Sequence, residues 1–181
     1  MNLRNLLRHF LTITRHRHLV IAHCRRAGIL RQGLFHDLSK YHPAEFLSGA
    51  RHFSGTRSPN DVEREVYGYS RTWLRHKGRN KHHFEYWMDY RLDTGRMGAV
   101  KMPFRYVVEM FCDRVAASKI YMGDRYTCTC PLRYFERGIS SRMIHPETAD
   151  FIQSLLTMLC ERGEAETFRY IKALVRSKGE Y

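Results

Sequence analysis

The chain has 181 residues, of which 43% are hydrophobic, and this composition excludes a disordered chain and indicates one domain with a sizeable core. Its 31 lysines and arginines outnumber 18 acidic residues, and the formal net charge of +13 favours anionic partners such as nucleotides, nucleic acid or anionic lipid. No apolar run approaches the roughly 18 residues of a membrane span, and the five cysteines, an odd number, indicate reduced thiols rather than a secreted disulfide framework.

The first predicted element is an amphipathic helix that ends at Gly28. Residues 1–36 carry seven arginines and no acidic residue, a composition that resembles an organellar transit peptide. We expect this segment to belong to the folded protein, because it supplies part of a predicted site, and we therefore predict a cytoplasmic location. The apolar stripe of the helix recurs at steps of three and four residues and comprises Leu3, Leu6, Phe10, Ile13, Val20, Cys24 and Ala27.

Shorter helices are predicted to follow. One covers about 29–39, and the next begins at Pro43, because proline is favoured in the first turn of a helix. After the polar loop SGTRSPN, Ser58 and Pro59 form a cap and first-turn pair, from which a single helix is predicted to run on to His76.

The second half of the chain is also predicted to be helical. Pro103 begins one helix, Pro146 and Gly163 bracket another, and a last helix covers about 164–177. Residues 120–135 give the weakest pattern, and no segment alternates as a strand would. The predicted fold class is therefore all-α, a single domain of about seven to nine helices with little or no sheet.

Chemistry-bearing side chains interrupt these apolar stripes. His36 directly precedes Asp37 in GLFHDLSKYHPAEF, and on a helix the two side chains would point about 100° apart and could converge on one point. His16 shares a face of the first helix with Val20. Asp113 is flanked by apolar residues, and a buried carboxylate needs a cation or several donors. Two imidazoles and two carboxylates suit a divalent transition metal such as Mn, Fe, Co, Ni or Zn.

The order H…HD…D over helical segments resembles the HD-domain superfamily of metal-dependent phosphohydrolases. HRHLV at 16–20 is similar to the opening H-x-x-x-V of that family, LFHDLSK at 34–40 to its L-x-HD-x-x-K, and EMFCDRVAAS at 109–118 to the segment with its final aspartate. His18 and His23 are alternatives for the first ligand. The resemblance implies a helical bundle whose metal ligands are His16, His36, Asp37 and Asp113.

A second polar cluster lies in WLRHKGRNKHHFEYW at 73–87. This stretch is similar to a narrower, uncharacterised group of phage or bacterial HD-like proteins with HD-x-S-K and N-x-HH. In two-metal relatives, histidines after the HD pair bind a second ion, so these residues are candidates for a second metal or for substrate binding. The alternative is a solvated basic turn between helices. The candidates are His76, Lys77, Asn80, His82 and His83.

The resemblance also defines the expected domain and activity. Residues 1–181 would form one HD-like domain, with the metal site in about 10–120 and a C-terminal helical extension in about 121–181. From their apolar face, the two helices predicted at about 146–162 and 164–177 are expected to pack on the core and to supply no ligand. One or two ions would support hydrolysis of a nucleotide-like or other phosphoester. Asp37 would bind metal and orient water, and Lys40 would stabilise the phosphoryl charge.

Three alternatives remain open at the level of sequence. The chain could be a non-catalytic nucleic-acid-binding or sensor module on an HD scaffold, because aromatic and basic residues alternate in KHHFEYW. Some HD-like proteins are di-iron oxygenases, and a fold alone does not decide between these chemistries. The basic amphipathic N-terminus would also suit a protein of the membrane surface. Metal content distinguishes the first two from hydrolysis.

Overall fold

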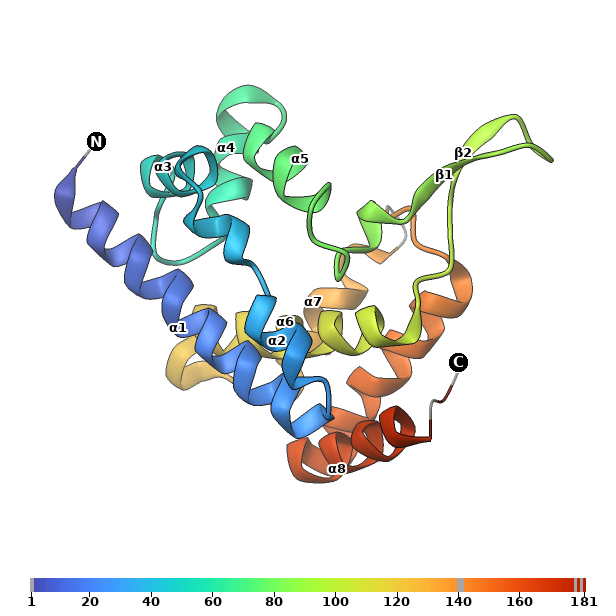
Figure 1. The fold of residues 1–181 in the computed structure, drawn as a ribbon. Coiled ribbons are helices and arrows are strands. Elements are labelled where there is room, and N and C mark those ends of the chain that lie inside the picture. Colours follow the sequence, from blue (N-terminus) through green and yellow to red (C-terminus); the bar gives the residue numbers. More distant parts are fainter. Residues whose placement is uncertain (1, 140–141, 178, 180) are drawn as a thin grey trace.

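Helix α1 (Leu3–Ala27) forms one edge of the molecule in the computed structural model, which describes residues 2–139, 142–177, 179 and 181 (Figure 1). The side chain of Asn2 caps the first turn by accepting a hydrogen bond from the Arg4 amide. The helix ends where it was predicted to end, at Gly28, whose φ of 86° is favourable for glycine alone among common residues. Its inner face buries Ile13, Val20 and Cys24.

The segment after α1 differs from its prediction. A helix over 29–39 is wrong: α2 (Leu30–Phe35) is short, His36 has extended backbone, Asp37 has a φ of 53°, and the 3₁₀ turn η1 (Leu38–Tyr41) follows. Helix α3 (Pro43–Arg51) begins at its proline as predicted. The HD dipeptide therefore lies in a break between two helical segments and not on a helix.

One helix predicted from Ser58 to His76 is two in the structure. Helix α4 (Pro59–Tyr67) ends at Gly68, which has a φ of 77°, and α5 (Arg71–Lys77) begins after Ser70. The Ser70 side chain accepts a hydrogen bond from the Trp73 amide. A glycine in the left-handed region followed by a serine cap ends one helix and starts another.

A small antiparallel hairpin was not predicted. The 3₁₀ turn η2 (Phe84–Tyr86) precedes strand β1 (Met88–Arg91), which pairs with β2 (Arg96–Ala99) in the register Met88↔Ala99 and Arg91↔Arg96. Both strands are four residues long and largely exposed; β1 (MDYR) alternates apolar and polar residues over these four positions alone, and β2 (RMGA) does not alternate, so the pattern is too short to predict a strand.

The core lies between α1, α6 (Phe104–Met122) and α8 (Pro146–Arg176) (Figure 1). Along the chain between α6 and α8, η3 (Gly123–Arg125) and α7 (Cys130–Glu136) contact α6. The two predicted C-terminal helices form one element, α8, broken at Gly163, where φ is 73° and ψ is 174°. Fully buried core side chains include Val107, Phe111, Val115, Ile152, Leu155 and Leu159.

The described part of the chain thus holds eight α-helices and one two-stranded sheet, and the all-α prediction is confirmed. None of its helices combines the length and the apolar character needed to cross a bilayer. The architecture brings α1, the break after α2 and α6 side by side, and the turn after α5 lies above them (Figure 1).

Gly33 lets α2 approach α1 closely enough to position that break. A β-carbon added at Gly33 would lie 2.6 Å from the Cβ of Cys24 and 3.3 Å from the Cα of Ile21. Overpacking of this kind costs about 1–3 kcal/mol, more than the roughly 1 kcal/mol that alanine gains over glycine within a helix. We therefore expect Gly33→Ala to lower the free energy of unfolding by about 1 kcal/mol net, measured by urea denaturation.

Gly78→Ala is the matched control for this prediction. Gly78 has a φ of −71°, and the nearest atom to its added β-carbon lies at 3.4 Å, an ordinary contact. We expect this substitution to leave the urea midpoint nearly unchanged. Equal midpoints for the two variants would show that α2 can move away from α1 without cost.

Candidate metal centre

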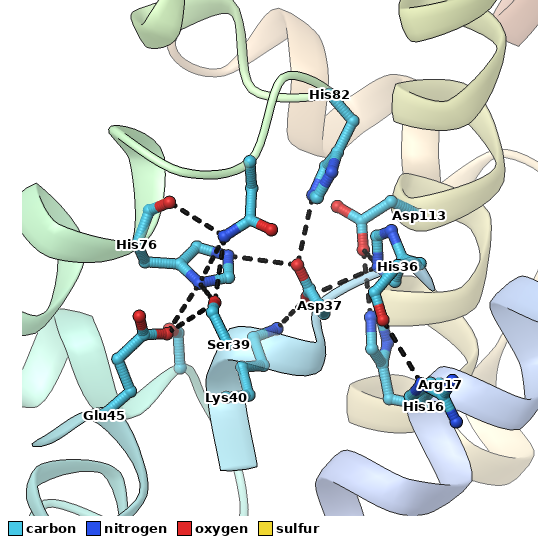
Figure 2. A network of polar contacts seen from close by, with 12 residues as sticks. His16, Arg17, His36, Asp37, Ser39, Lys40, Glu45, His76, His82 and Asp113 are labelled. Atoms are coloured by element: carbon cyan, nitrogen blue, oxygen red, sulfur yellow. Dashed lines mark hydrogen bonds and ion pairs between the residues drawn. The ribbon is translucent and has the colours of Figure 1, made fainter. Parts of the chain in front are cut away.

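Four of the predicted residues meet at the junction of α1, α6 and the break after α2 (Figure 2). The Nε2 atom of His16 lies 2.9 Å from Oδ1 of Asp113. The Nε2 atom of His36 lies 3.3 Å from Oδ2 of Asp37 and 3.5 Å from Oδ1 of Asp113. These four residues form the first cluster, in which one donor atom from each lies within 4.8 Å of the others.

The backbone break explains how His36 and Asp37 both face this point. Asp37 is the one described non-glycine residue with positive φ, a conformation that aspartate tolerates better than most residues. Arg17, on α1, donates from Nε to the carbonyl oxygen of His36 at 3.2 Å and from Nη2 to the carbonyl oxygen of Leu34. These hydrogen bonds from Arg17 hold the backbone around His36 and Asp37 in place, so the orientation of the dipeptide depends on a residue about 20 positions earlier.

A second cluster faces the other oxygen of Asp37. Its Oδ1 atom lies 3.3 Å from Nε2 of His76 and 3.4 Å from Nε2 of His82. His83 is the fourth member, and one donor atom from each of the four residues again lies within 4.8 Å of the others. His82 and His83 are in a turn before η2, where neighbouring side chains can reach the same point.

Asp37 therefore belongs to both clusters, with Oδ2 toward the first and Oδ1 toward the second (Figure 2). Both oxygens are buried, and neither makes a hydrogen bond of acceptable geometry, although Nζ of Lys40 lies 2.6 Å from Oδ2. The Nε2 atoms of five histidines around them also make no hydrogen bond of acceptable geometry. Buried polar atoms without partners are costly, and donor atoms that face one another in this way suit a cation between them. The five are His16, His36, His76, His82 and His83.

Glu109, on α6, orients two of these imidazoles. Its Oε1 atom lies 2.9 Å from Nδ1 of His36 and 3.2 Å from Nδ1 of His82, so one carboxylate serves a histidine of each cluster. Burial alone would raise the pKa of Glu109, but the hydrogen bonds from both histidines outweigh it and lower the pKa to about 2. With Nδ1 donating to this carboxylate, the Nε2 lone pairs point into the clusters, the usual arrangement of metal-binding histidines.

Glu45, on α3, orients a third imidazole, that of His76. Its Oε2 atom lies 2.9 Å from Nδ1 of His76 and accepts a hydrogen bond from the Ser39 hydroxyl at 3.0 Å. Neither Glu45 nor Glu109 was predicted as a site residue. Glu109 precedes Asp113 by one helical turn and so shares its face of α6, which is a signal that the sequence offered. Glu45 has no such signal, because its first-turn position suits any acidic residue.

Protonation within the first cluster follows from its charges. Burial lowers the pKa of His36, but Asp37, Asp113 and Glu109 outweigh it and raise the pKa well above the usual value. Burial keeps the pKa of His16 below its usual value. For Asp37, the surrounding cations overcome burial and hold its pKa well below the usual range. A divalent ion would therefore compete with the proton on His36, as metals do at histidine sites.

The remaining candidates lie around the clusters. His18 and His23, the alternatives for the first ligand, do not take the place of His16. His18 is exposed, and Nδ1 of His23 lies 3.2 Å from the carbonyl oxygen of Cys112. Asn80 donates from its side chain to the Ser39 hydroxyl at 3.0 Å and to the His76 carbonyl oxygen at 2.8 Å, which fastens the turn that follows α5. Lys77 ends α5, outside the described clusters.

A cleft of about 300 Å³ opens on the outer side of these clusters. The rings of His36 and His82 and the carboxylate of Glu109 form part of its wall. Three cationic side chains also line it, together with the aromatic rings of Phe35 and Tyr106, so the cleft is positively charged near the site. The cations are Arg31, Arg79 and Lys81.

Comparison with known proteins yields one match. The sequence model of a family of unknown function, DUF5662, matches residues 5–158, a range that includes every member of both clusters. No curated protein and no solved structure matches the chain.

Proposed function

This chain belongs to the DUF5662 family, and we propose that it is an HD-type metal-dependent phosphohydrolase that acts on a nucleotide-like or other phosphoester substrate. The observation that carries the proposal is Asp37, whose two oxygens face two separate groups of buried donor atoms. A carboxylate shared in this way could hold two divalent ions, the arrangement used by many phosphoryl-transfer enzymes.

The donor atoms favour transition metals over magnesium or calcium. The first cluster offers two imidazoles and two carboxylates, and the second offers three imidazoles and the shared carboxylate. Nitrogen-rich sets of this kind suit Mn, Fe, Co, Ni or Zn, whereas magnesium and calcium prefer oxygen. Such ions polarise a phosphoryl oxygen and lower the pKa of bound water toward neutrality.

Lys40 is the residue best suited to meet the phosphoryl group. Its Nζ atom lies 2.6 Å from Oδ2 of Asp37, and the side chain is 32% exposed, so it reaches from the clusters toward solvent. Burial lowers the pKa of this lysine, but the Asp37 charge outweighs it and raises the pKa, so Lys40 is a cation at physiological pH. We assign it to stabilising negative charge on the phosphoryl group, and Asp37 to holding metal and orienting water.

The chain as a whole would gather an anionic substrate. Its formal charge is +13, and the cleft beside the clusters adds Arg31, Arg79 and Lys81 near the site. A field of this sign raises the encounter rate with phosphate esters and is weakened by salt. The HD-type assignment rests on the order of the cluster residues along the chain together with their convergence.

Metal analysis followed by a phosphoester panel tests the proposal. Protein purified without chelator should contain up to two transition-metal ions per chain, one for each cluster. It should hydrolyse members of a panel that contains p-nitrophenyl phosphate, its diester and nucleoside phosphates. Activity should disappear with a chelator and return with Mn, Co or Ni.

Two other results would replace this function with a rival. Two irons per chain with oxygen uptake and no phosphate release would indicate an oxygenase built on the same donor atoms. Protein that stays free of metal after equilibration with each ion would indicate a nucleic-acid-binding or sensor module.

A further inference from the structure

The N-terminal half of α1 has a second apolar face that stays largely exposed in the described chain. Leu3 is 79% exposed, Leu7 59%, Phe10 43% and Leu11 50%. These four residues, the outer face of α1, lie within a sector of about 100° on the helix. On the opposite side of the same helix His9 and Ile13 are buried, and the His9 ring packs against Phe46 and Phe53. One long helix therefore has an inner and an outer apolar face.

The apolar surface continues onto the next segment. The rings of Phe10 and Tyr41 are 6.0 Å apart, and Arg17 bonds the carbonyl oxygen of Leu34. These contacts place α2 and η1 beside α1, and Leu34 and Leu38 are exposed there as well. Exposed large apolar side chains that gather on one surface mark an interaction site rather than chance.

Cations border the outer face on one side. At about 100° per residue, Arg4, Arg8 and Arg15 lie along one edge of the stripe, and all three are exposed. The first 36 residues contain no acidic side chain. Arginines at the edge of an apolar stripe can extend their guanidinium groups to a charged plane while the stripe enters a less polar layer.

A second copy of this chain is a poor occupant of this face. A two-fold interface along α1 would bring the same row of arginines together, and residues 1–36 contain no acid that could pair with them. Nucleic acid would supply phosphates but would leave the leucines in water. An anionic lipid surface satisfies both the apolar stripe and its charged border.

We propose that the outer face of α1 docks the protein on anionic membrane surfaces, with the helix lying in the plane of the interface. Figure 1 shows α1 along one edge of the molecule, where a flat surface can approach it. The docking face contains no member of the two clusters, so this proposal does not depend on the proposed function.

Vesicle sedimentation of the full chain tests the proposal. We expect binding to vesicles of phosphatidylcholine with phosphatidylglycerol and little binding to phosphatidylcholine alone. The double variant Leu7→Gln, Leu11→Gln should lower the partition coefficient by about tenfold or more. Arg4→Gln with Arg15→Gln should lower it by about 30-fold at low salt, because each arginine near an anionic surface contributes about fivefold.

Leu92→Gln is the matched control, because Leu92 is 91% exposed between β1 and β2, away from α1. It should bind vesicles as the unmodified chain does. The proposal fails if anionic vesicles do not bind the protein, or if the α1 variants bind as well as the control. It also fails if the leucine variant merely converts a dimer into a monomer in gel filtration, since a second copy would then occupy this face.

Discussion

Asp37→Asn is expected to abolish retention of metal at both clusters and any hydrolysis that depends on it. Asparagine tolerates the positive φ of this position almost as well as aspartate, so the break after α2 keeps its shape. The substitution removes the charge and one oxygen of the side chain that both clusters share. We expect affinity for metal to fall by more than the roughly 10–100-fold that is typical for loss of an outer-shell partner.

Metal content after dialysis and turnover of the best phosphoester measure this effect, and circular dichroism checks the helices. Asp37→Ala should lose metal equally but also destabilise the fold, because alanine is disfavoured at a φ of 53°. His18→Ala is the control: His18 lies on α1 two residues after His16 but is exposed. Two ions retained by Asp37→Asn would show that the carboxylate is not shared.

Glu109→Gln is expected to lower the affinity of both clusters for metal, whereas Glu45→Gln should lower the affinity of the second cluster alone. Glu109 orients His36 of the first cluster and His82 of the second, but Glu45 contacts His76 alone among the cluster histidines. Glutamine keeps an acceptor but loses the charge that makes the imidazoles better donors. Each affected ion should bind about 10–100-fold more weakly, measured by competitive titration with a metal indicator.

Glu63→Gln is the control that separates this effect from general damage. Glu63 is also a buried glutamate, but its partners are Ser48, Ser70 and Thr72, which lie outside both clusters. It should lower stability without changing either metal affinity. If Glu109→Gln weakened only one ion, or if Glu63→Gln weakened both, the outer-shell roles assigned here would be wrong.

The fold could be predicted from local patterns because its helices carry their own signals. The apolar stripe of α1, its glycine end and the prolines that open α3 and α8 all act within a turn or two of sequence. The break after Phe35 could not be predicted in this way. Its conformation depends on Arg17, whose hydrogen bonds cross from α1 to two carbonyl oxygens of the break.

The candidate site could likewise be predicted only in part. The chemical types of His16, His36, Asp37 and Asp113 predict a metal site from the sequence alone, and the structure brings their donor atoms together. The pairing of Glu109 with His36, 73 positions away, could not be predicted, although the place of Glu109 one turn before Asp113 was a signal for the site; Glu45 carried none. Long-range pairing of this kind depends on the packing of α6 against α1 and α2, which periodicity alone does not define.

The uninterrupted course of α1 restricts how its sequence can change in length. No glycine or proline stands between Leu3 and Ala27, so rotation at any point is transmitted along the whole rod. One inserted residue between Ile13 and His16 would turn everything before it by about 100°. Leu7 would swing out of the outer face, and His9 and Ile13 out of the core. A substitution on this helix changes a single side chain, whereas an insertion or deletion of one residue disrupts one face or the other.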